Sequence, residues 1–506
     1  MSRNYVINAM LHYQGGDLQS LLPPLLIPIV LMAPRLHIFF FPLMAAGHII
    51  PMVDIARLFV GRGVKATLLA PAPKPPLLDH CVKKARDLGQ HIDLLLLPLP
   101  PSPTGSPERP TFLTSPAMSL EFFRALEHLR EPLERALREH RPNCIISDMF
   151  LPWTADAARR LGIPRLVFHG MGFFPLCVLD SLDRHLTGSN TRFGDSDVVV
   201  VPGLPHPVSM KRSQLHDSVE TRNDFSAFME RITESEIGSH GAVVNSFFEM
   251  EADYVDHYRD VMGRKAWHIG PVSLWNRDAD ELAERGGASD NYRSILTWLD
   301  SKPSNSVVYV CFGSLCHLTA AQLHQLGFGL EASSHGFIWA INGDEQHFGG
   351  RQEKVEERGK GLMVRGWGPQ RPILNHRAVG AFITHCGWNS VVETVSAGVP
   401  MITWPMFAEQ FYNEKLVVQV LRIGVSVGPG VWGMEQEKKP VVGGAAIAAA
   451  VAQLMDGGGE AEEGMRKRAA ALKQKARDAV GVGGSSYLEM DRLIHELSVS
   501  ESDATE

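Results

Sequence analysis

Patterns of buried strands and amphipathic helices alternate along the chain from Leu36 onward. Continuous apolar runs without polar alternation are typical of parallel strands that are covered on both faces. In the first half, the runs that predict strands are 36–42, 65–71, 91–100, 143–148, 165–170, 241–247 and 266–272. Apolar residues at helical spacing predict a helix over 49–60, which Gly61 can end as a C-cap.

A polar, acidic stretch over 276–292 has no apolar period and is the best candidate for a linker. Beyond it, strands are expected at 306–314, 337–341, 361–367, 379–386 and 400–405, and helices from 443 to about 498. The alternation predicts two doubly wound α/β domains, over 34–275 and 293–480. We expect the helix and tail over 481–506 to pack back on the N-terminal domain. In such sheets, ligands bind beyond the carboxyl ends of the strands.

The composition excludes several classes of protein. The 506 residues include 49 Lys and Arg against 56 Asp and Glu, and this net charge of −7 argues against a nucleic-acid partner. The 6 cysteines form no CxxC pair, which favours a reducing compartment and argues against a disulfide scaffold or structural zinc. The apolar run at 21–32 is interrupted by prolines and is too short to span a bilayer. We expect residues 1–33 to be a disordered extension rather than a targeting signal, and the protein to be a cytoplasmic monomer without an integral membrane segment.

Several familiar signatures are absent or out of context. The sequence contains no GxxxxGK[ST], no strand–GxGxxG–helix and no HExxH, which disfavours a Walker-type NTPase, a typical dinucleotide enzyme and a zincin. Residues 424–428 match GxSxG, the pattern of a nucleophilic serine. However, Ser426 lies in a β-branched run without a following helix, whereas the nucleophile elbow requires a strand, a sharp turn and a helix. A serine hydrolase is therefore the disfavoured alternative.

The most informative segment runs from 367 to 410. Within it, a strand ends at His385, Gly387 lets another group approach the backbone closely, and a helix begins near Asn389. The open N–H groups and positive dipole end of such a helix suit a pyrophosphate. Simple helix capping by Asn389 and Ser390 is the commoner role for these residue types, and it stays open.

Neighbouring residues extend this possible nucleotide site. Glu393 lies one helical turn further on, within reach of a ribose diol, and Ser314 can supply a second hydroxyl. Trp367 can stack on a planar base, although a buried core tryptophan is the more common case. Glu409 and Gln410 follow an expected strand and can bind sugar hydroxyls, but surface loop residues would look the same.

The 367–410 segment closely resembles the signature of plant secondary-product UDP-glycosyltransferases. Segments 40–59, 147–169, 245–251 and 483–490 are similar to the branch that acts on flavonoids, triterpenoids and related aglycones, and the resemblance covers roughly 34–498. It implies the GT-B fold, in which two Rossmann-like domains face a cleft. It also implies sugar transfer from a UDP-sugar to a small hydrophobic acceptor without a cofactor or a metal. Gln410, which ends the signature, implies glucose.

The same resemblance implies a role for each matching residue. Trp367, Gly368 and Gln370 would bind the uracil, and Glu393 the ribose. The diphosphate would be held by four residues, His385, Asn389, Ser390 and Ser314. Trp388, Glu409 and Gln410 would contact the sugar, and Ala408 would lie near the acceptor. We expect loops of the N-terminal domain, including the one with Phe150, to line the acceptor pocket.

The catalytic pair is expected in the N-terminal domain. His48 lies at the start of the first helix, and Asp148 closes the strand at 143–148. Carboxyl ends of parallel strands share one edge, so Asp148 can orient the His48 imidazole, as in a Ser-His-Asp arrangement. The helix dipole disfavours the imidazolium and is expected to help keep His48 neutral. Without the resemblance, a helix-terminal histidine and an N-capping aspartate explain these residues equally well.

These observations predict inverting transfer of a sugar, with His48 removing the proton of the acceptor hydroxyl and Asp148 assisting. The alternative is a catalytically silent protein that binds UDP-sugars.

Overall fold

The computed structural model describes residues 36–98, 116–187, 193–216, 219, 222–275, 289–341, 359–366, 368–428, 430–457 and 459–499. The expected extension over 1–33 lies outside the described residues. Most of the expected linker over 276–292 also lies outside them, and its last positions, 289–292, belong to helix α13 (Ser289–Asp300).

The N-terminal domain contains a seven-stranded sheet in which every pairing is parallel. Its strands are β1 (His37–Phe41), β2 (Lys65–Ala72), β3 (Ile92–Pro98), β4 (Cys144–Asp148), β5 (Arg165–His169), β8 (Gly241–Val244) and β9 (Ala266–His268). The spatial order is β3-β2-β1-β4-β5-β8-β9, so the direction of winding reverses between β1 and β4. A crevice forms at such a switch point, beyond the carboxyl ends of the two strands.

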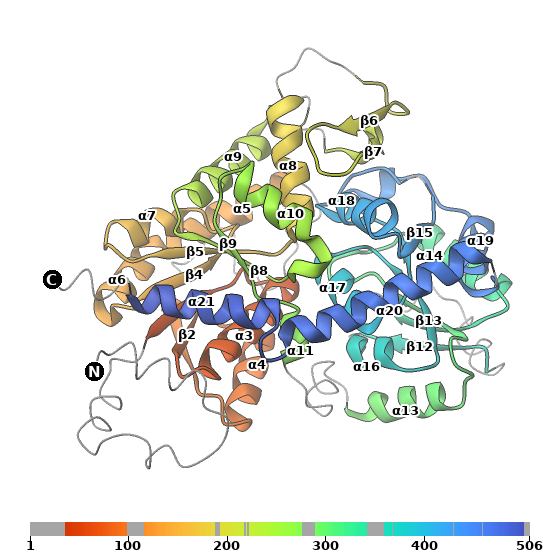
Figure 1. Cartoon of the computed structure of the whole chain (residues 1–506), viewed down its shortest axis with the longest axis horizontal. Coiled ribbons are helices and arrows are strands. Elements are labelled where there is room, and N and C mark those ends of the chain that lie inside the picture. Colours follow the sequence, from red (N-terminus) through yellow and green to blue (C-terminus); the bar gives the residue numbers. More distant parts are fainter. Residues whose placement is uncertain are drawn as a thin grey trace.

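Helices cover both faces of this sheet (Figure 1). They are α3 (Ala46–Val60), α4 (Pro76–Asp87), α5 (Pro116–Leu126), α6 (Arg130–His140), α7 (Trp153–Arg159), α8 (Phe173–His185), α9 (Asp224–Ile237), α10 (Phe248–Asp260) and α11 (Val272–Trp275). The period-2 alternation of a strand explains the two layers: Ile38 and Phe40 join the core under α3 and α4, whereas Phe39 and Phe41 join the opposite core. Both layers are apolar, which is why the strand reads as an unbroken hydrophobic run.

The C-terminal domain repeats this plan with six parallel strands. They are β10 (Val307–Cys311), β11 (Gly336–Ile341), β12 (Gly361–Arg365), β13 (Val379–Thr384), β14 (Met401–Thr403) and β15 (Gly424–Ser426). Besides α13, its helices are α14 (Ala320–Ala332), α16 (Gln370–Asn375), α17 (Trp388–Ala397), α18 (Gln410–Lys415), α19 (Gly444–Met455) and α20 (Glu460–Val480). The order β12-β11-β10-β13-β14-β15 puts the switch point between β10 and β13.

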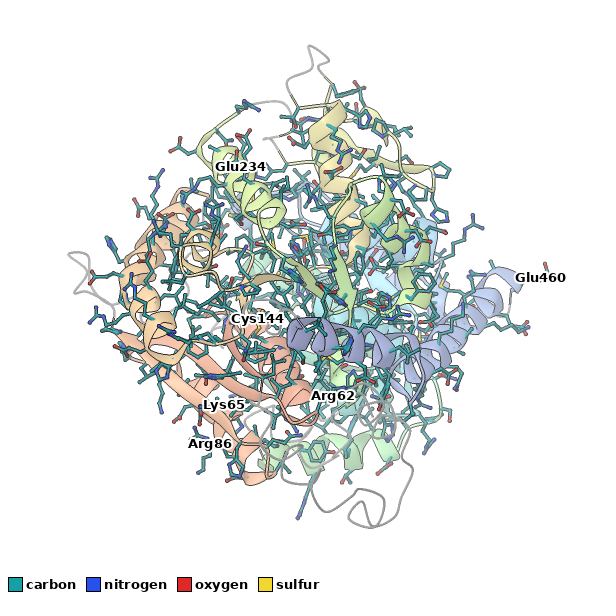
Figure 2. The ribbon with its side chains drawn as sticks, turned by 60° about the vertical axis from the view of Figure 1, so that its left-hand side comes forward. Arg62, Lys65, Arg86, Cys144, Glu234 and Glu460 are labelled. Carbon is teal, nitrogen blue, oxygen red and sulfur yellow. The ribbon has the colours of Figure 1, made fainter. Side chains whose placement is uncertain are left out.

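The last helix returns to the N-terminal domain. Helix α20 begins at Glu460, at the outer end of the molecule, and α21 (Ser485–Val499) continues along the same side (Figures 1 and 2). Met490, Leu493 and Leu497 of α21 are buried in the core under β9 and α3. At the helix surface, Arg62 Nε donates to Asp491 Oδ1 at 2.9 Å. The chain therefore crosses between the domains a second time.

The α/β class with two facing domains agrees with the sequence prediction, and each expected strand is present with ends that shift by a few residues. The pattern did not predict the antiparallel hairpin of β6 (Val198–Val201) and β7 (Val208–Lys211). Among the helices in the described ranges, none combines the length and the apolar character that crossing a membrane requires.

Candidate active site

The two switch points face one cavity of about 290 Å³. Residues that follow β1 and β4 line it from the N-terminal domain, and residues that follow β10, β13 and β14 line it from the C-terminal domain. The sequence-predicted residues that line it are His48, Phe150, Ser314, Gly368, Gln370, His385, Trp388, Asn389, Ser390, Glu393, Ala408, Glu409 and Gln410. Asp148 lies directly behind His48. Trp367 lies outside the described residues.

His48 and Asp148 form a hydrogen-bonded pair although 100 positions separate them in the chain. Nδ1 of His48 lies 2.7 Å from Oδ2 of Asp148, and the aspartate is fully buried whereas 18% of the histidine side chain is exposed. The other carboxylate oxygen, Oδ1, accepts the backbone N–H of Phe150 at 3.1 Å. Asp148 is thus fixed in place, and the imidazole presents its second nitrogen, Nε2, for other partners.

The electrostatics of His48 differ from the sequence expectation. Burial by itself lowers the pKa of His48, but the charge and hydrogen bond of Asp148, together with the charge of Glu409, outweigh burial and raise it. The expectation that the helix dipole keeps this imidazole neutral is therefore wrong about the direction of the shift. A raised pKa makes His48 a stronger proton acceptor.

An aromatic wall leads from the interior to His48. The rings of Phe228 and Phe123 stack with centroids 4.9 Å apart, and those of Phe123 and Phe150 stack at 5.0 Å. Phe150 then meets the His48 ring edge-on at 5.8 Å. Phe123 and Phe150 line the cavity beside Met149 and Met171, so the side of the cavity nearest His48 is flat and apolar.

The N-terminus of α17 forms the opposite wall of the cavity. Asn389 in its first turn does not cap the helix; its Nδ2 donates to the carbonyl of Gly47 at 2.7 Å, which ties this helix to the start of α3. A side chain at Gly387 would bring a Cβ within 2.4 Å of His385 Nε2, so only glycine leaves the helix start open. The N–H groups that follow Trp388 in this first turn have no acceptor within the helix and can bind an anion.

His385 is close to this helix start, and no carboxylate among the described residues contributes to the shift of its pKa. Burial lowers its pKa to about 4, so the imidazole is neutral at physiological pH. Its buried Nδ1 has no hydrogen-bond partner among the described residues. Gly313, with φ of +73°, packs against the same ring, since a Cβ there would lie 2.7 Å from it. A neutral imidazole can donate one hydrogen bond to a ligand without exchanging a proton with it.

Gln370 connects two of the predicted ligand-binding residues. Its Nε2 donates to Glu393 Oε2 at 2.9 Å and to Ser390 Oγ at 3.3 Å. All three side chains belong to α16 and α17, which pack together beside β13. Gly368 precedes α16 and lines the same part of the cavity.

The loop after β14 carries the three predicted residues nearest the sugar and acceptor. Oε1 of Gln410 accepts the backbone N–H groups of Met406 at 2.9 Å and Phe407 at 3.1 Å, which folds the loop over the side chain. Ala408 has φ of +53°, a left-handed conformation that favours glycine. Burial is the main reason that the pKa of Glu409 is raised, although its carboxylate accepts hydrogen bonds from the Trp388 backbone and the Asn413 side chain.

The side chain of Trp388 is not available to bind a sugar. Its indole is 2% exposed and inserts into the N-terminal domain, where Nε1 donates to the carbonyl of Asn245 at 2.9 Å. A Cβ on Gly172 would lie 2.2 Å from this ring, so the glycine makes room for it. The Trp388 side chain is therefore occupied, and its backbone N–H already donates to the Glu409 carboxylate.

The serine of the GxSxG pattern carries no comparable geometry. Ser426 lies on the edge strand β15, and its Oγ donates to Glu414 Oε2 at 3.1 Å rather than standing at an elbow, which confirms the sequence argument against a serine hydrolase. Within the part of the chain that the structure describes, no group of three or more His, Cys, Asp or Glu side chains is arranged to hold a metal ion.

Two α/β domains with parallel sheets that face one cleft are the architecture of GT-B glycosyltransferases. Comparison with known proteins agrees. Residues 288–427 match the family model described as UDP-glucoronosyl and UDP-glucosyl transferase. The chain is 45% identical to scopoletin glucosyltransferase of Nicotiana tabacum over 479 residues, covering 92% of this chain and 99% of that protein. It is also 45% identical to anthocyanin 3'-O-beta-glucosyltransferase of Gentiana triflora, covering 92% and 98%.

Solved structures agree with these relatives. UGT73P12 of Glycyrrhiza uralensis, complexed with glycyrrhetinic acid 3-O-monoglucuronide, matches with a TM-score of 0.85 and 37% identity over 93% of this chain and 97% of that one. UGT71G1 of Medicago truncatula, complexed with UDP-glucose, matches with a TM-score of 0.76 and 25% identity over 92% and 98%. The chain belongs to the plant UDP-glycosyltransferase family and is a transferase enzyme.

Sequence reasoning missed the contacts that join the two walls. The bonds from Asn389 to Gly47 and from Trp388 to Asn245 both cross between the domains. Neither has a local sequence signal, because an asparagine or a tryptophan at a helix start has several possible partners.

Proposed function

We propose that this enzyme transfers glucose from UDP-glucose to a hydroxyl of a small hydrophobic acceptor, with inversion at the anomeric carbon. The observation that carries the proposal is the 2.7 Å contact between His48 Nδ1 and Asp148 Oδ2 on one wall of a cavity whose other wall is a helix N-terminus. One wall can remove a proton, and the other can receive a negatively charged leaving group.

In the proposed step, Nε2 of His48 takes the proton of the acceptor hydroxyl. The acceptor oxygen forms a bond to the anomeric carbon while the bond from that carbon to the diphosphate oxygen breaks on the opposite face. The products are a β-glycoside and UDP, and the proton remains on His48. Asp148 stabilises the imidazolium that forms, in the way a buried carboxylate does in hydrolase triads.

The donor is proposed to lie along the C-terminal wall. The start of α17, with Ser390, Asn389 and the neutral His385, would bind the diphosphate together with Ser314. Glu393 would bind the ribose, and Gly368 and Gln370 the uracil beside Trp367. Glu409 and Gln410 would bind the sugar, and Trp388 would orient Glu409 through its backbone N–H. No step of this proposal requires a metal or a cofactor.

The acceptor is proposed to be a planar, largely apolar molecule with a hydroxyl. The stacked rings of Phe123 and Phe150 next to His48 favour a flat aromatic ring system. Relatives named as scopoletin and anthocyanin glucosyltransferases support phenolic and flavonoid acceptors. The complex of UGT73P12 with a glycyrrhetinic acid glucuronide supports including terpenoid and steroid aglycones among the candidates.

One incubation tests the proposal. The purified protein receives UDP-glucose and a panel of flavonoids, coumarins, simple phenols and triterpenoid and steroid aglycones, and mass spectrometry detects products heavier by one hexosyl unit. NMR of the anomeric proton then reports the configuration, and a β-linkage is expected. An α-linkage would contradict inversion. UDP binding without transfer to any acceptor would favour the alternative of a silent UDP-sugar-binding protein.

A further inference from the structure

Two side chains of the segment 430–442, which lies between β15 and α19, donate hydrogen bonds to backbone carbonyls of the loop that follows β14. Trp432 Nε1 donates to the carbonyl of Ala408 at 3.0 Å. Lys439 Nζ donates to the carbonyl of Met406. This loop carries Glu409 and Gln410, so the segment lies directly behind the proposed sugar site without contributing to the cavity lining among the described residues.

The same segment contacts the other domain. The backbone N–H of Trp432 donates to the carbonyl of Ser213 at 2.8 Å. The Trp432 ring also meets the ring of His216 edge-on, with centroids 4.1 Å apart and planes at 77°. Further along, Met434 Sδ lies 4.0 Å from Ser119 Oγ, one helical turn before Phe123 in the aromatic wall. Trp432 therefore forms hydrogen bonds both to the N-terminal domain, which is proposed to bind the acceptor, and to the loop that follows β14.

The loop has a physical need for this support. Ala408 has φ of +53°, a conformation that L-residues other than glycine, asparagine and aspartate adopt rarely. A residue in such a conformation persists where the surroundings fix it, and sites of this kind gather around ligands. The indole N–H of Trp432 reaches the carbonyl of that same residue.

We propose that Trp432 is a positioning residue for sugar transfer. It connects His216 of the N-terminal domain to the loop that carries Glu409 and Gln410. The inference rests on the proposed function, because it requires that this loop binds the donor sugar. Uracil and diphosphate are proposed to bind α16 and α17 instead, which Trp432 does not contact in the described structure. Loss of the hydrogen bond from Trp432 Nε1 to the Ala408 carbonyl should then weaken binding of the sugar part of UDP-glucose, while the affinity for UDP is retained.

The test compares Trp432→Phe, which keeps an aromatic ring against His216 but removes the indole N–H, with the wild-type enzyme. We expect KM for UDP-glucose to rise by about 3- to 10-fold, the range of one lost hydrogen bond, while Kd for UDP by calorimetry stays within about 2-fold. The matched control is Trp275→Phe. Trp275 also donates its indole N–H to a backbone carbonyl, that of Ile269 at 3.3 Å, but its ring stacks on Tyr487 of α21 and it is not among the described residues that line the cavity. This control should leave both constants unchanged.

A second variant tests the coupling between domains. His216→Ala should also raise KM for UDP-glucose, although His216 belongs to the acceptor domain and is not among the described residues that line the cavity. Unchanged KM in both Trp432→Phe and His216→Ala, with an active wild-type enzyme, would overturn the positioning role. A parallel loss of UDP binding would indicate general disruption and would also overturn it. A wild-type protein that does not bind UDP would instead contradict the proposed function itself.

Discussion

The two switch points share a topology and differ in the chemistry of their histidines. In the N-terminal sheet, the β1 segment is followed by His48 and the neighbouring β4 ends at Asp148. In the C-terminal sheet, β13 is followed by His385 and the neighbouring β10 by Gly313. Asp148 raises the pKa of His48, whereas burial without a carboxylate lowers the pKa of His385 to about 4.

The comparison shows that the residue at the end of the adjacent strand decides what a buried histidine can do. A carboxylate there makes the imidazole a stronger base and gives it a fixed orientation. A glycine there leaves the imidazole neutral and lets it lie against the backbone. One fold thus builds a proton acceptor on one side of the cleft and an uncharged hydrogen-bond donor on the other. Each variant below alters one wall of the cleft.

The largest effect is expected for His48→Ala. Removing a general base lowers the rate by about 10²- to 10⁴-fold, so kcat with a phenolic acceptor should fall within that range. Kd for UDP, measured by calorimetry, should not change, because the donor is proposed to lie on the other wall. Wild-type turnover by this variant would show that another group removes the proton.

Asp148→Asn should lower kcat by about 10²-fold, since the amide cannot stabilise the imidazolium as a carboxylate does. Steady-state rates at saturating UDP-glucose measure this loss, and folding is checked by thermal unfolding beside the wild type. Kd for UDP should be retained. A variant that loses UDP affinity but keeps kcat would place Asp148 in donor binding instead of catalysis.

His385→Ala tests the other side of the comparison. We expect Kd for UDP to rise by about 2- to 10-fold, which corresponds to the loss of one hydrogen bond of about 0.5–1.5 kcal/mol. The difference between the variant and wild type should be the same from pH 6 to pH 8, because a histidine with a pKa of about 4 does not change charge there. Calorimetry at the two pH values provides the measurement, and a difference that varies with pH would contradict a neutral His385.

An effect of similar size, on the acceptor instead of the donor, is expected for Phe123→Leu in the aromatic wall. An aromatic pair contributes about 0.5–1.5 kcal/mol beyond the area it buries, so KM for a planar aromatic acceptor should rise by about 2- to 10-fold. KM for UDP-glucose should stay the same, which separates the acceptor wall from the donor wall. An equal rise for both substrates would indicate that the cavity has changed shape as a whole.

The sequence predicted those parts of the fold and site that depend on local pattern. Apolar runs mark parallel strands, and carboxyl ends of neighbouring strands meet, so a contact between His48 and Asp148 could be expected although 100 positions separate them. The helix start at α17 could be expected for the same reason, because strand, glycine and helix follow directly in the chain.

Contacts between the domains could not be predicted in this way. The insertion of the Trp388 indole beside Gly172, and the meeting of Trp432 with His216, depend on how two separately patterned domains are placed against each other. The direction of the His48 pKa shift was also missed. It depends on the balance between burial and the charges of Asp148 and Glu409, and this balance is set by the distances between the groups in the folded protein. The valines of β6 lie in a short hairpin outside the main sheet, where the alternating strand and helix pattern gives no signal.

The pH dependence of kcat/KM for the acceptor, at saturating UDP-glucose, tests the central claim most directly. His48 must be neutral to accept a proton, so activity should fall as the pH drops through its raised pKa, and the acid limb should lie above the ordinary histidine value of 6.5. In Asp148→Asn, burial is no longer opposed by that carboxylate, and the acid limb should move to lower pH. Acid limbs at the same pH in both enzymes would contradict the account, because Asp148 would then not set the basicity of the group that removes the proton.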